Sequence, residues 1–335
     1  MTVKSKIREA LARGYYLTRR LSSRLEGKVL ILAYHRVLSE KELKEQFVQP
    51  GMYVRDDAFE RQMRFLREYF RILSFDELLG LWDRGGWDGR QRYCVVTLDD
   101  GWLDNYLHAY PVLRKYEIPA TVFLPTSFIG TREWFWPEKL VFLLDRYIKS
   151  GQKERLTALW GRWPRPAADG NGGEGIDSII EICKGLPEGE VEKIIGEIGR
   201  GSGIAFPPER SVVNWKEVEE MSASGISFGS HSATHKILTK LSREEVRNEL
   251  KTSFDTLRGK KIKTVPVFCY PNGNFDPAVA ELVREAGYRA AVTTQFGFES
   301  ESPADRFGLK RIGVHQDIGS TDPLFSWHLS GMNRF

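Results

Sequence analysis

The chain is poor in cysteine and contains no long apolar run. Its three cysteines, Cys94, Cys183 and Cys269, are widely spaced in 335 residues and include no CxxC pair. So few thiols cannot build a disulfide framework, and they suit a reducing compartment. No run of about 18 apolar residues occurs, which predicts no transmembrane helix. The N-terminus also lacks the uninterrupted apolar stretch of a signal peptide, so we expect no secretory leader.

Outside the N-terminal segment, the sequence has no large excess of positive or negative charge. The whole chain carries a net charge of +4, but residues 1–28 hold eight basic and two acidic residues, a balance of +6. The remaining 307 residues therefore sum to −2. Because this main part shows no basic excess, we expect no nucleic-acid partner.

The basic segment has a helical pattern of apolar residues, namely Ile7, Leu11, Tyr15, Leu21 and Leu25. We therefore expect a basic N-terminal helix over 1–28. Such a helix can lie on an anionic membrane surface, which would give a peripheral membrane contact. A solvated or core-packed terminal helix explains the same pattern, and an organellar transit segment is a third interpretation.

What the chain does have is enough apolar material for a large core. Hydrophobic residues make up 41% and aromatic residues 12%, which argues against global disorder. Short apolar runs predict strands near 29–34, 71–74, 93–98, 120–124, 226–230, 265–270, 289–293 and 311–314. Helical patterns fall between most of them, at 57–70, 75–83, 104–116, 214–224, 242–257 and 276–286. This alternation predicts an α/β fold, a distorted (β/α) barrel of about seven to eight parallel strands.

One segment interrupts the alternation. Residues 131–212 show several helical patterns but no convincing strand, which predicts a mostly helical insertion within a barrel domain spanning 29–320. The glycine-rich stretch 168–175 suggests a mobile loop inside it. We expect residues 321–335 to form a C-terminal tail.

Three clusters of polar residues follow predicted strands. Asp99 and Asp100 are adjacent carboxylates, and a divalent cation would relieve their repulsion by binding one of them. His231 and His235 are four residues apart, a spacing that places both on one face of a helical turn and suits one metal ion. The turn at 269–273 can aim a backbone N–H at an oxyanion. Each cluster alone also fits an ordinary turn, cap or core residue.

The shared position of these clusters favours a site. In β/α barrels the active site forms at the carboxyl ends of the strands, where all three clusters lie. His35 and His315 also follow predicted strands. We interpret His108 and His328 as structural. Trp102, Trp134 and Trp136 either form a sugar platform or are buried.

Two of the clusters resemble motifs of the NodB-homology polysaccharide deacetylases, carbohydrate esterase family 4. TLDDG at 97–101 is similar to the TFDDG motif of that family, and HSATH at 231–235 to its H-S/T-x-x-H motif. The resemblance covers roughly 29–320, apart from the insertion. AYHRV at 33–37 also resembles members that deacetylate bacterial exopolysaccharides. The resemblance implies a NodB-like barrel and a hydrolase that removes N-acetyl groups from amino sugars.

The resemblance also implies roles. Asp99 would be the general base, and Asp100, His231 and His235 would hold a divalent metal, usually Zn²⁺, with Co²⁺, Ni²⁺, Mn²⁺ or Fe²⁺ as variants. The segment 269–273 resembles the third motif, R-x-P-Y-G, in which the backbone N–H of Asn272 would help to hold the oxyanion. Two features depart from the family. Cys269 replaces the arginine that orients the base, and the general acid has no clear match. His315 is the first candidate for that acid and His35 the second.

Several alternatives stay open. The substrate would be a polysaccharide or a lipid-linked saccharide that carries an N-acetylated amino sugar. The basic N-terminus and the missing leader favour a cytoplasmic enzyme, peripheral at the inner face of the membrane. A carbohydrate-binding pseudoenzyme on the same fold is a second hypothesis, supported by the missing arginine at Cys269. A metal-dependent O-acetyl esterase is a third.

Overall fold

The computed structural model describes residues 3–19, 21, 23–151, 176–202 and 204–332. The chain divides into two compact units. The barrel unit comprises Met1–Glu40, Pro50–Thr131 and Val212–Phe335. The insertion unit comprises Lys41–Gln49 and Arg132–Ser211.

The barrel unit is built on a closed ring of parallel strands. Its members are β1 (Lys28–Tyr34), β5 (Arg92–Leu98), β6 (Ala120–Leu124), β7 (Ser227–Ser230), β8 (Thr264–Cys269), β9 (Ala290–Phe296) and β10 (Leu309–Gly313). The ring closes because β1 pairs with both β5 and β10. The two-residue strand β4 (Arg71–Ile72) pairs beside the start of β5. The predicted distorted barrel of seven to eight strands is therefore confirmed.

The strands are apolar on both faces because both faces are covered. Within β1, Val29 and Ile31 join one buried cluster with residues of β5, β8 and β9. Leu30 and Leu32, which alternate with them, join a second cluster that includes Phe59 of the following helix. Strand residues thus face alternately the barrel interior and the surrounding helices.

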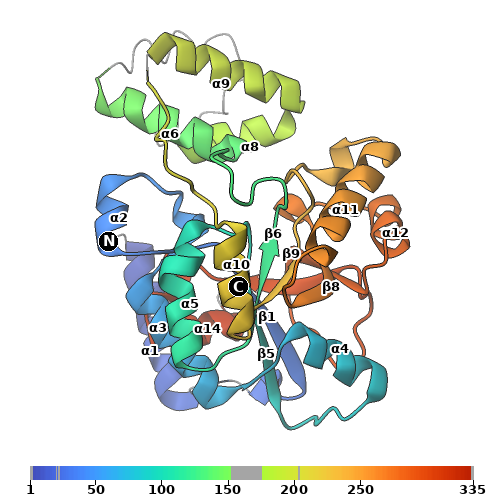
Figure 1. Ribbon diagram of the computed structural model, residues 1–335. Helices are drawn as coiled ribbons and strands as arrows, with labels where there is room; N and C mark the ends of the chain where they lie inside the picture. Colours follow the sequence, from blue (N-terminus) through green and yellow to red (C-terminus); the bar gives the residue numbers. More distant parts are fainter. Residues whose placement is uncertain (1–2, 20, 22, 152–175, 203, 333–335) are drawn as a thin grey trace. The chain divides into compact units, whose positions relative to one another are not determined.

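Helices surround the ring of strands, as Figure 1 shows. They are α3 (Asp56–Tyr69), α4 (Phe75–Arg84), α5 (Tyr110–Lys115), α10 (Trp215–Ala223), α11 (Arg243–Arg258) and α12 (Pro277–Glu285), and a π-helical turn, η3 (Asn105–Ala109), precedes α5. Capping boxes begin α4 at Ser74, α10 at Asn214 and α11 at Ser242. A small second sheet pairs β2 (Arg36–Leu38) with β3 (Tyr53–Arg55), and its short strands were not predicted.

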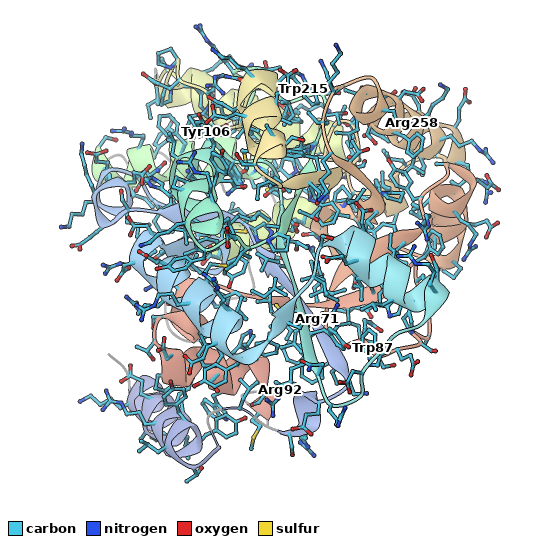
Figure 2. The ribbon with its side chains drawn as sticks, turned by 60° about the horizontal axis from the view of Figure 1, so that its bottom comes forward. Arg71, Trp87, Arg92, Tyr106, Trp215 and Arg258 are labelled. Carbon is cyan, nitrogen blue, oxygen red and sulfur yellow. The ribbon has the colours of Figure 1, made fainter. Side chains whose placement is uncertain are left out.

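The amino-terminal end of the barrel is closed by side chains that have no role in the site. Tyr93, near the start of β5, is fully buried, and the Trp87 ring lies 4.4 Å from its ring. The Arg71 guanidinium lies 5.8 Å from the centre of the same ring. Figure 2 brings this end forward and labels Arg71, Trp87 and Arg92 there. Polar functional residues must therefore gather at the opposite end.

The two ends of the chain differ from expectation. The N-terminal helix α1 spans Val3–Arg19 and does not continue to residue 28, because Leu21 and Leu25 turn into the core. Residues 322–329, expected within a tail, form helix α14 (Asp322–Leu329), whose Leu324 and Phe325 are buried. Helix α1 packs against α14, so both termini belong to the barrel unit. A short helix, α13 (Gln316–Gly319), precedes α14.

The insertion unit has a core of its own. Its helices α6 (Trp136–Lys149), α8 (Ile176–Gly185) and α9 (Glu188–Ser202) share a cluster of buried aliphatic residues. Helix α2 (Glu40–Glu45) lies where the chain first enters this unit. The predicted loop at 168–175 lies outside the described residues. None of the described helices has both the length and the apolar character needed to span a bilayer.

Candidate metal and catalytic site

The site forms where β5, β7, β8 and β10 end. Asp99 and Asp100 follow β5 directly, His231 follows β7, and Cys269 is the last residue of β8. The Asp99 N–H donates to Tyr34 O at 2.8 Å, and the His231 N–H donates to Leu124 O at 3.0 Å. These bonds extend the strand ladders, so the rigid barrel fixes where both side chains begin.

Asp100, His231 and His235 lie together. Asp100 Oδ1 is 3.3 Å from His231 Nε2 and 3.2 Å from His235 Nε2. One ligand atom from each residue lies within 4.8 Å of the others. Asp100 and His231 are buried, whereas the His235 side chain is 22% exposed. One carboxylate and two imidazoles, open on one side, match the donor set of a catalytic divalent metal.

The two histidines meet for a different reason than the sequence suggested. Residues 231–235 do not form a helical turn. Ser232 and His235 adopt left-handed backbone conformations with φ of 62° and 60°, and Asp100 has φ of 72°. Such angles are unfavourable for residues other than glycine and cluster at functional sites. The structure therefore brings His231 and His235 together without the helical turn that their spacing predicted.

Glu249 of α11 holds this unusual loop in place. Its Oε2 accepts the N–H groups of Ala233 and Thr234 at 2.9 and 2.8 Å, and its Oε1 accepts the Thr234 hydroxyl at 2.6 Å. Glu249 is buried, and hydrogen bonds to a buried carboxylate are strong. This contact anchors the segment between the two histidines to the barrel wall.

Further hydrogen bonds orient two of the ligand side chains. His231 Nδ1 donates to Cys269 O at 2.7 Å, which leaves Nε2 directed at Asp100. Trp102 Nε1 donates to Asp100 Oδ2 at 2.9 Å, which leaves Oδ1 near both imidazoles. Outer contacts of this kind fix a metal ligand before the metal binds. Trp102 is buried, so of the two interpretations given for it, sugar platform or burial, the structure favours burial.

Asp99 is paired with an arginine that the sequence did not single out. Arg311 of β10 donates from Nη1 to Asp99 Oδ1 at 2.8 Å and from Nη2 to Oδ2 at 2.7 Å. Both residues are buried. Burial raises the pKa of Asp99, but the Arg311 guanidinium outweighs burial, so the pKa lies below its ordinary value. Asp99 is therefore a carboxylate at neutral pH.

A second possible ligand group can be set aside. Asp99, His231 and Cys269 also lie within 4.8 Å of one another. However, both Asp99 oxygens already accept from Arg311, which also contacts Cys269 Sγ at 3.3 Å. Burial raises the pKa of the Cys269 thiol well above its ordinary value, so it is protonated. A neutral thiol is a poor metal ligand, and the Asp100 group fits a metal better.

The structure separates the two candidate acids. His35 Nε2 lies 3.9 Å from Asp99 Oδ2, and Asn105 Nδ2 donates to His35 O at 2.8 Å. His315 begins α13, and its Nδ1 lies 3.9 Å from Asp317 Oδ2. Burial lowers the pKa of His315, which keeps its imidazole neutral at neutral pH. Of the two, His35 is the one whose imidazole lies within 4 Å of Asp99 among the described ion pairs.

The turn after β8 carries Asn272. It follows Cys269 at the same rim, and Asn272 has a left-handed φ of 57°. Gly273, with φ of 73°, approaches Thr294 so closely that a Cβ would lie 2.1 Å from its hydroxyl oxygen. The turn thus requires glycine at position 273, where a side chain would not fit.

His328 of α14, which we predicted to be structural, is buried, and its Nε2 donates to Gly313 O at 2.8 Å.

Comparison with known proteins agrees with this geometry. The model of the polysaccharide deacetylase family matches residues 87–168 and 181–291. YxkH of Bacillus subtilis, whose name assigns it to the polysaccharide deacetylases, is 22% identical over 291 residues, covering 86% of this chain and 72% of its own length. A poly-β-1,6-N-acetyl-D-glucosamine N-deacetylase of Staphylococcus aureus is 31% identical over 150 residues, which span 40% of this chain and 47% of that protein.

A solved structure shares the fold. The deacetylase PplD of Streptococcus pyogenes, determined with acetate, superposes with a TM-score of 0.58 at 19% identity, covering 89% of this chain and 97% of that one. Since the family model matches more than half of the residues, the assignment does not depend on any single relative. The chain belongs to the polysaccharide deacetylase family.

Proposed function

We propose that this protein is a metal-dependent hydrolase that removes N-acetyl groups from amino sugars of a polysaccharide or a lipid-linked saccharide. The observation that carries the proposal is the Asp100, His231 and His235 donor group directly beside the arginine-bound Asp99. A metal site next to a positioned carboxylate base is what amide hydrolysis by water requires. Zn²⁺ is the expected metal, and the donor set also suits Co²⁺, Ni²⁺, Mn²⁺ or Fe²⁺.

Each residue has a distinct role in this proposal. Asp100, His231 and His235 would hold a divalent metal, which would supply Lewis-acid activation of water. Asp99 takes the proton from the attacking water, while Arg311 holds the carboxylate in place. The Asn272 N–H donates to the oxyanion that develops on the acetyl oxygen. As the C–N bond breaks, the amine leaves with a proton from a histidine, and acetate is the second product.

His35 is the better candidate for that histidine. The amine leaves from the same carbon that the water attacks, so the proton donor must lie close to Asp99. His35 satisfies this condition, with its Nε2 3.9 Å from Asp99 Oδ2. The carboxylate at that distance from His315 Nδ1 is that of Asp317. Burial also lowers the pKa of His315, so less of it carries the imidazolium proton at neutral pH.

His35→Gln should lower kcat for acetate release about 10²–10⁴-fold, because a proton donor to the leaving group contributes about that much. His315→Gln should keep kcat close to the wild-type value. Steady-state acetate release by both purified variants, with thermal melting as the control for folding, checks the assignment. The reverse order of the two effects would assign the acid to His315.

Removing the metal with a chelator should abolish acetate release, and adding Zn²⁺ should restore it. The fold should survive, because the ring of strands and the Asp99–Arg311 pair do not depend on an ion. Metal analysis and far-UV circular dichroism before and after treatment are the measurements. Full activity in a preparation shown to be free of metal would contradict the proposal.

The structure weakens one of the two alternative functions, the pseudoenzyme, and leaves the other, the O-acetyl esterase, open. The pseudoenzyme hypothesis rested on Cys269 in place of an arginine, and Arg311 supplies a guanidinium to Asp99 from β10. The O-acetyl esterase hypothesis stands beside the main proposal, since the same groups can attack an ester. Acetate release from paired N-acetylated and O-acetylated sugars separates these two. The cytoplasmic location stays a prediction.

A further inference from the structure

Helix α1 presents an apolar face to solvent. Ile7, Leu11 and Leu17 are 56%, 57% and 83% exposed, although they are aliphatic residues of a regular helix. At 100° per residue they fall within one side of the helix, and Ala10 and Gly14, also exposed, lie between them. The face extends over the eleven residues 7–17, so Ile7 and Leu17 lie about 15 Å apart along the helix axis.

The opposite face of α1 is already used. Ala12 is fully buried, and α1 packs against α14. The exposed side chains are therefore not the contact that attaches the helix to the barrel unit. Packing within the barrel unit accounts for the apolar residues on the buried face of α1, but not for those on its exposed face.

The charges around the exposed face are basic. Lys6 and Arg13 are exposed and lie next to Leu17 around the helix axis. Glu9 is the only acidic residue in the sequence of α1, and it is half-buried. Residues 1–28 together carry a charge of +6. An apolar face with basic residues along its border is complementary to an anionic lipid surface, into which aliphatic side chains insert while Lys and Arg meet the headgroups.

The first turns of α1 also contact the segment that follows β10. The Arg8 guanidinium donates to the backbone oxygen of Asp317, and Asp317 lies 3.9 Å from His315. His315 follows β10, at the rim where Asp99 and His35 lie. A surface bound by α1 would therefore lie near the mouth of the barrel, that is, the rim formed by the carboxyl ends of its strands.

We infer that α1 binds in the plane of an anionic phospholipid bilayer and holds the mouth of the barrel unit at the membrane surface. The catalytic proposal is not needed for this inference, since the binding can be measured without substrate. If both hold, the enzyme meets its acetylated glycan at the lipid surface.

The test is co-sedimentation of the full-length protein with phosphatidylcholine vesicles that contain or lack phosphatidylglycerol. The wild type should bind the anionic vesicles at least about tenfold more tightly than the neutral ones, and added salt should weaken binding. The triple variant Ile7→Gln, Leu11→Gln, Leu17→Gln and the double variant Lys6→Glu, Arg13→Glu should each lose most of this binding. Leu107→Gln removes an aliphatic side chain that is 51% exposed on η3, so it should bind as the wild type does.

Two results would overturn the inference. One is equal sedimentation of the wild type and the triple variant with anionic vesicles. The other is a dimer of the wild type in solution that the triple variant loses, because the apolar face would then bind a second copy of this chain. Acetate release from a soluble oligosaccharide should be the same in wild type and triple variant, so failure here is distinct from failure of the catalytic proposal.

Discussion

Replacing Asp99 with Asn should lower kcat for acetate release about 10²–10⁴-fold, because the amide cannot take the proton from water. Bound metal should stay at the wild-type level, because Asp100, His231 and His235 form the donor group. The free energy of unfolding should also fall, since the buried Arg311 loses its charged partner. Acetate release, metal content and thermal melting of the same preparation distinguish these three effects.

A matched control is Asp255→Asn, which removes an exposed carboxylate that pairs with Lys251 on α11. Exposed ion pairs contribute little to stability, so this variant should match the wild type in all three measurements. If Asp99→Asn turns over at the normal rate while folded and loaded with metal, Asp99 is not the base.

Replacing Arg311 with Met should have the second large effect. It leaves the Asp99 carboxylate buried without a partner, which costs about 3–5 kcal/mol of stability. It should also lower acetate release about 10–100-fold, as expected when a side chain that orients a reacting group is lost. Arg311→Lys should be intermediate between the wild type and Arg311→Met in both stability and acetate release. The lysine ammonium restores the positive charge but not the bidentate hydrogen bonding to Asp99.

The pH dependence of acetate release by Arg311→Met tests whether Arg311 acts on Asp99. If Arg311 only stabilised the fold, the pH profile would not shift. In the wild type the pKa of Asp99 is lowered, so its contribution to stability is present above the unfolded pKa and is lost as pH falls through the folded one. Without the guanidinium, only His35 and His231 oppose the effect of burial, so the pKa of Asp99 should rise. The acidic limb of the rate profile should therefore shift to higher pH, and raising the pH should restore part of the activity.

The surface variant Arg306→Met is the control for this series. Arg306 pairs with Asp83 at 2.7 Å in a half-exposed position, so its loss should change neither stability nor the pH profile. An Arg311→Met variant with wild-type stability and an unshifted profile would show that the guanidinium does not position the base.

The barrel could be predicted because its strands can be recognised from short stretches of sequence. Each is a short apolar run that ends at a turn, and burial on both faces makes the run continuous. Strands β2 and β3 are three residues each, too short for a pattern. The end of α1 was misplaced because Leu21 and Leu25 continue the helical spacing, although in the structure they point into the core from a separate turn.

The site was predicted in part, and the part that was missed is tertiary. Arg311 holds Asp99 from β10, which β1 separates from β5 in the ring, while the family motif pointed to position 269. In this chain the guanidinium beside Asp99 comes from β10. The available signal in the sequence was an arginine at the start of the predicted strand 311–314. The sequence could not rank His35 above His315, because both follow strands and only the folded geometry shows which one reaches Asp99.

The Glu249 contact has a consequence for the proposed metal site. Three hydrogen bonds from one buried carboxylate hold the backbone between His231 and His235. The conformational entropy of that loop is thus lost during folding rather than at the moment of binding. Ion affinity then depends mainly on the chemistry of the donors and little on ordering the protein. In the proposed metal site, one divalent ion could then replace another without a new ordering of this loop.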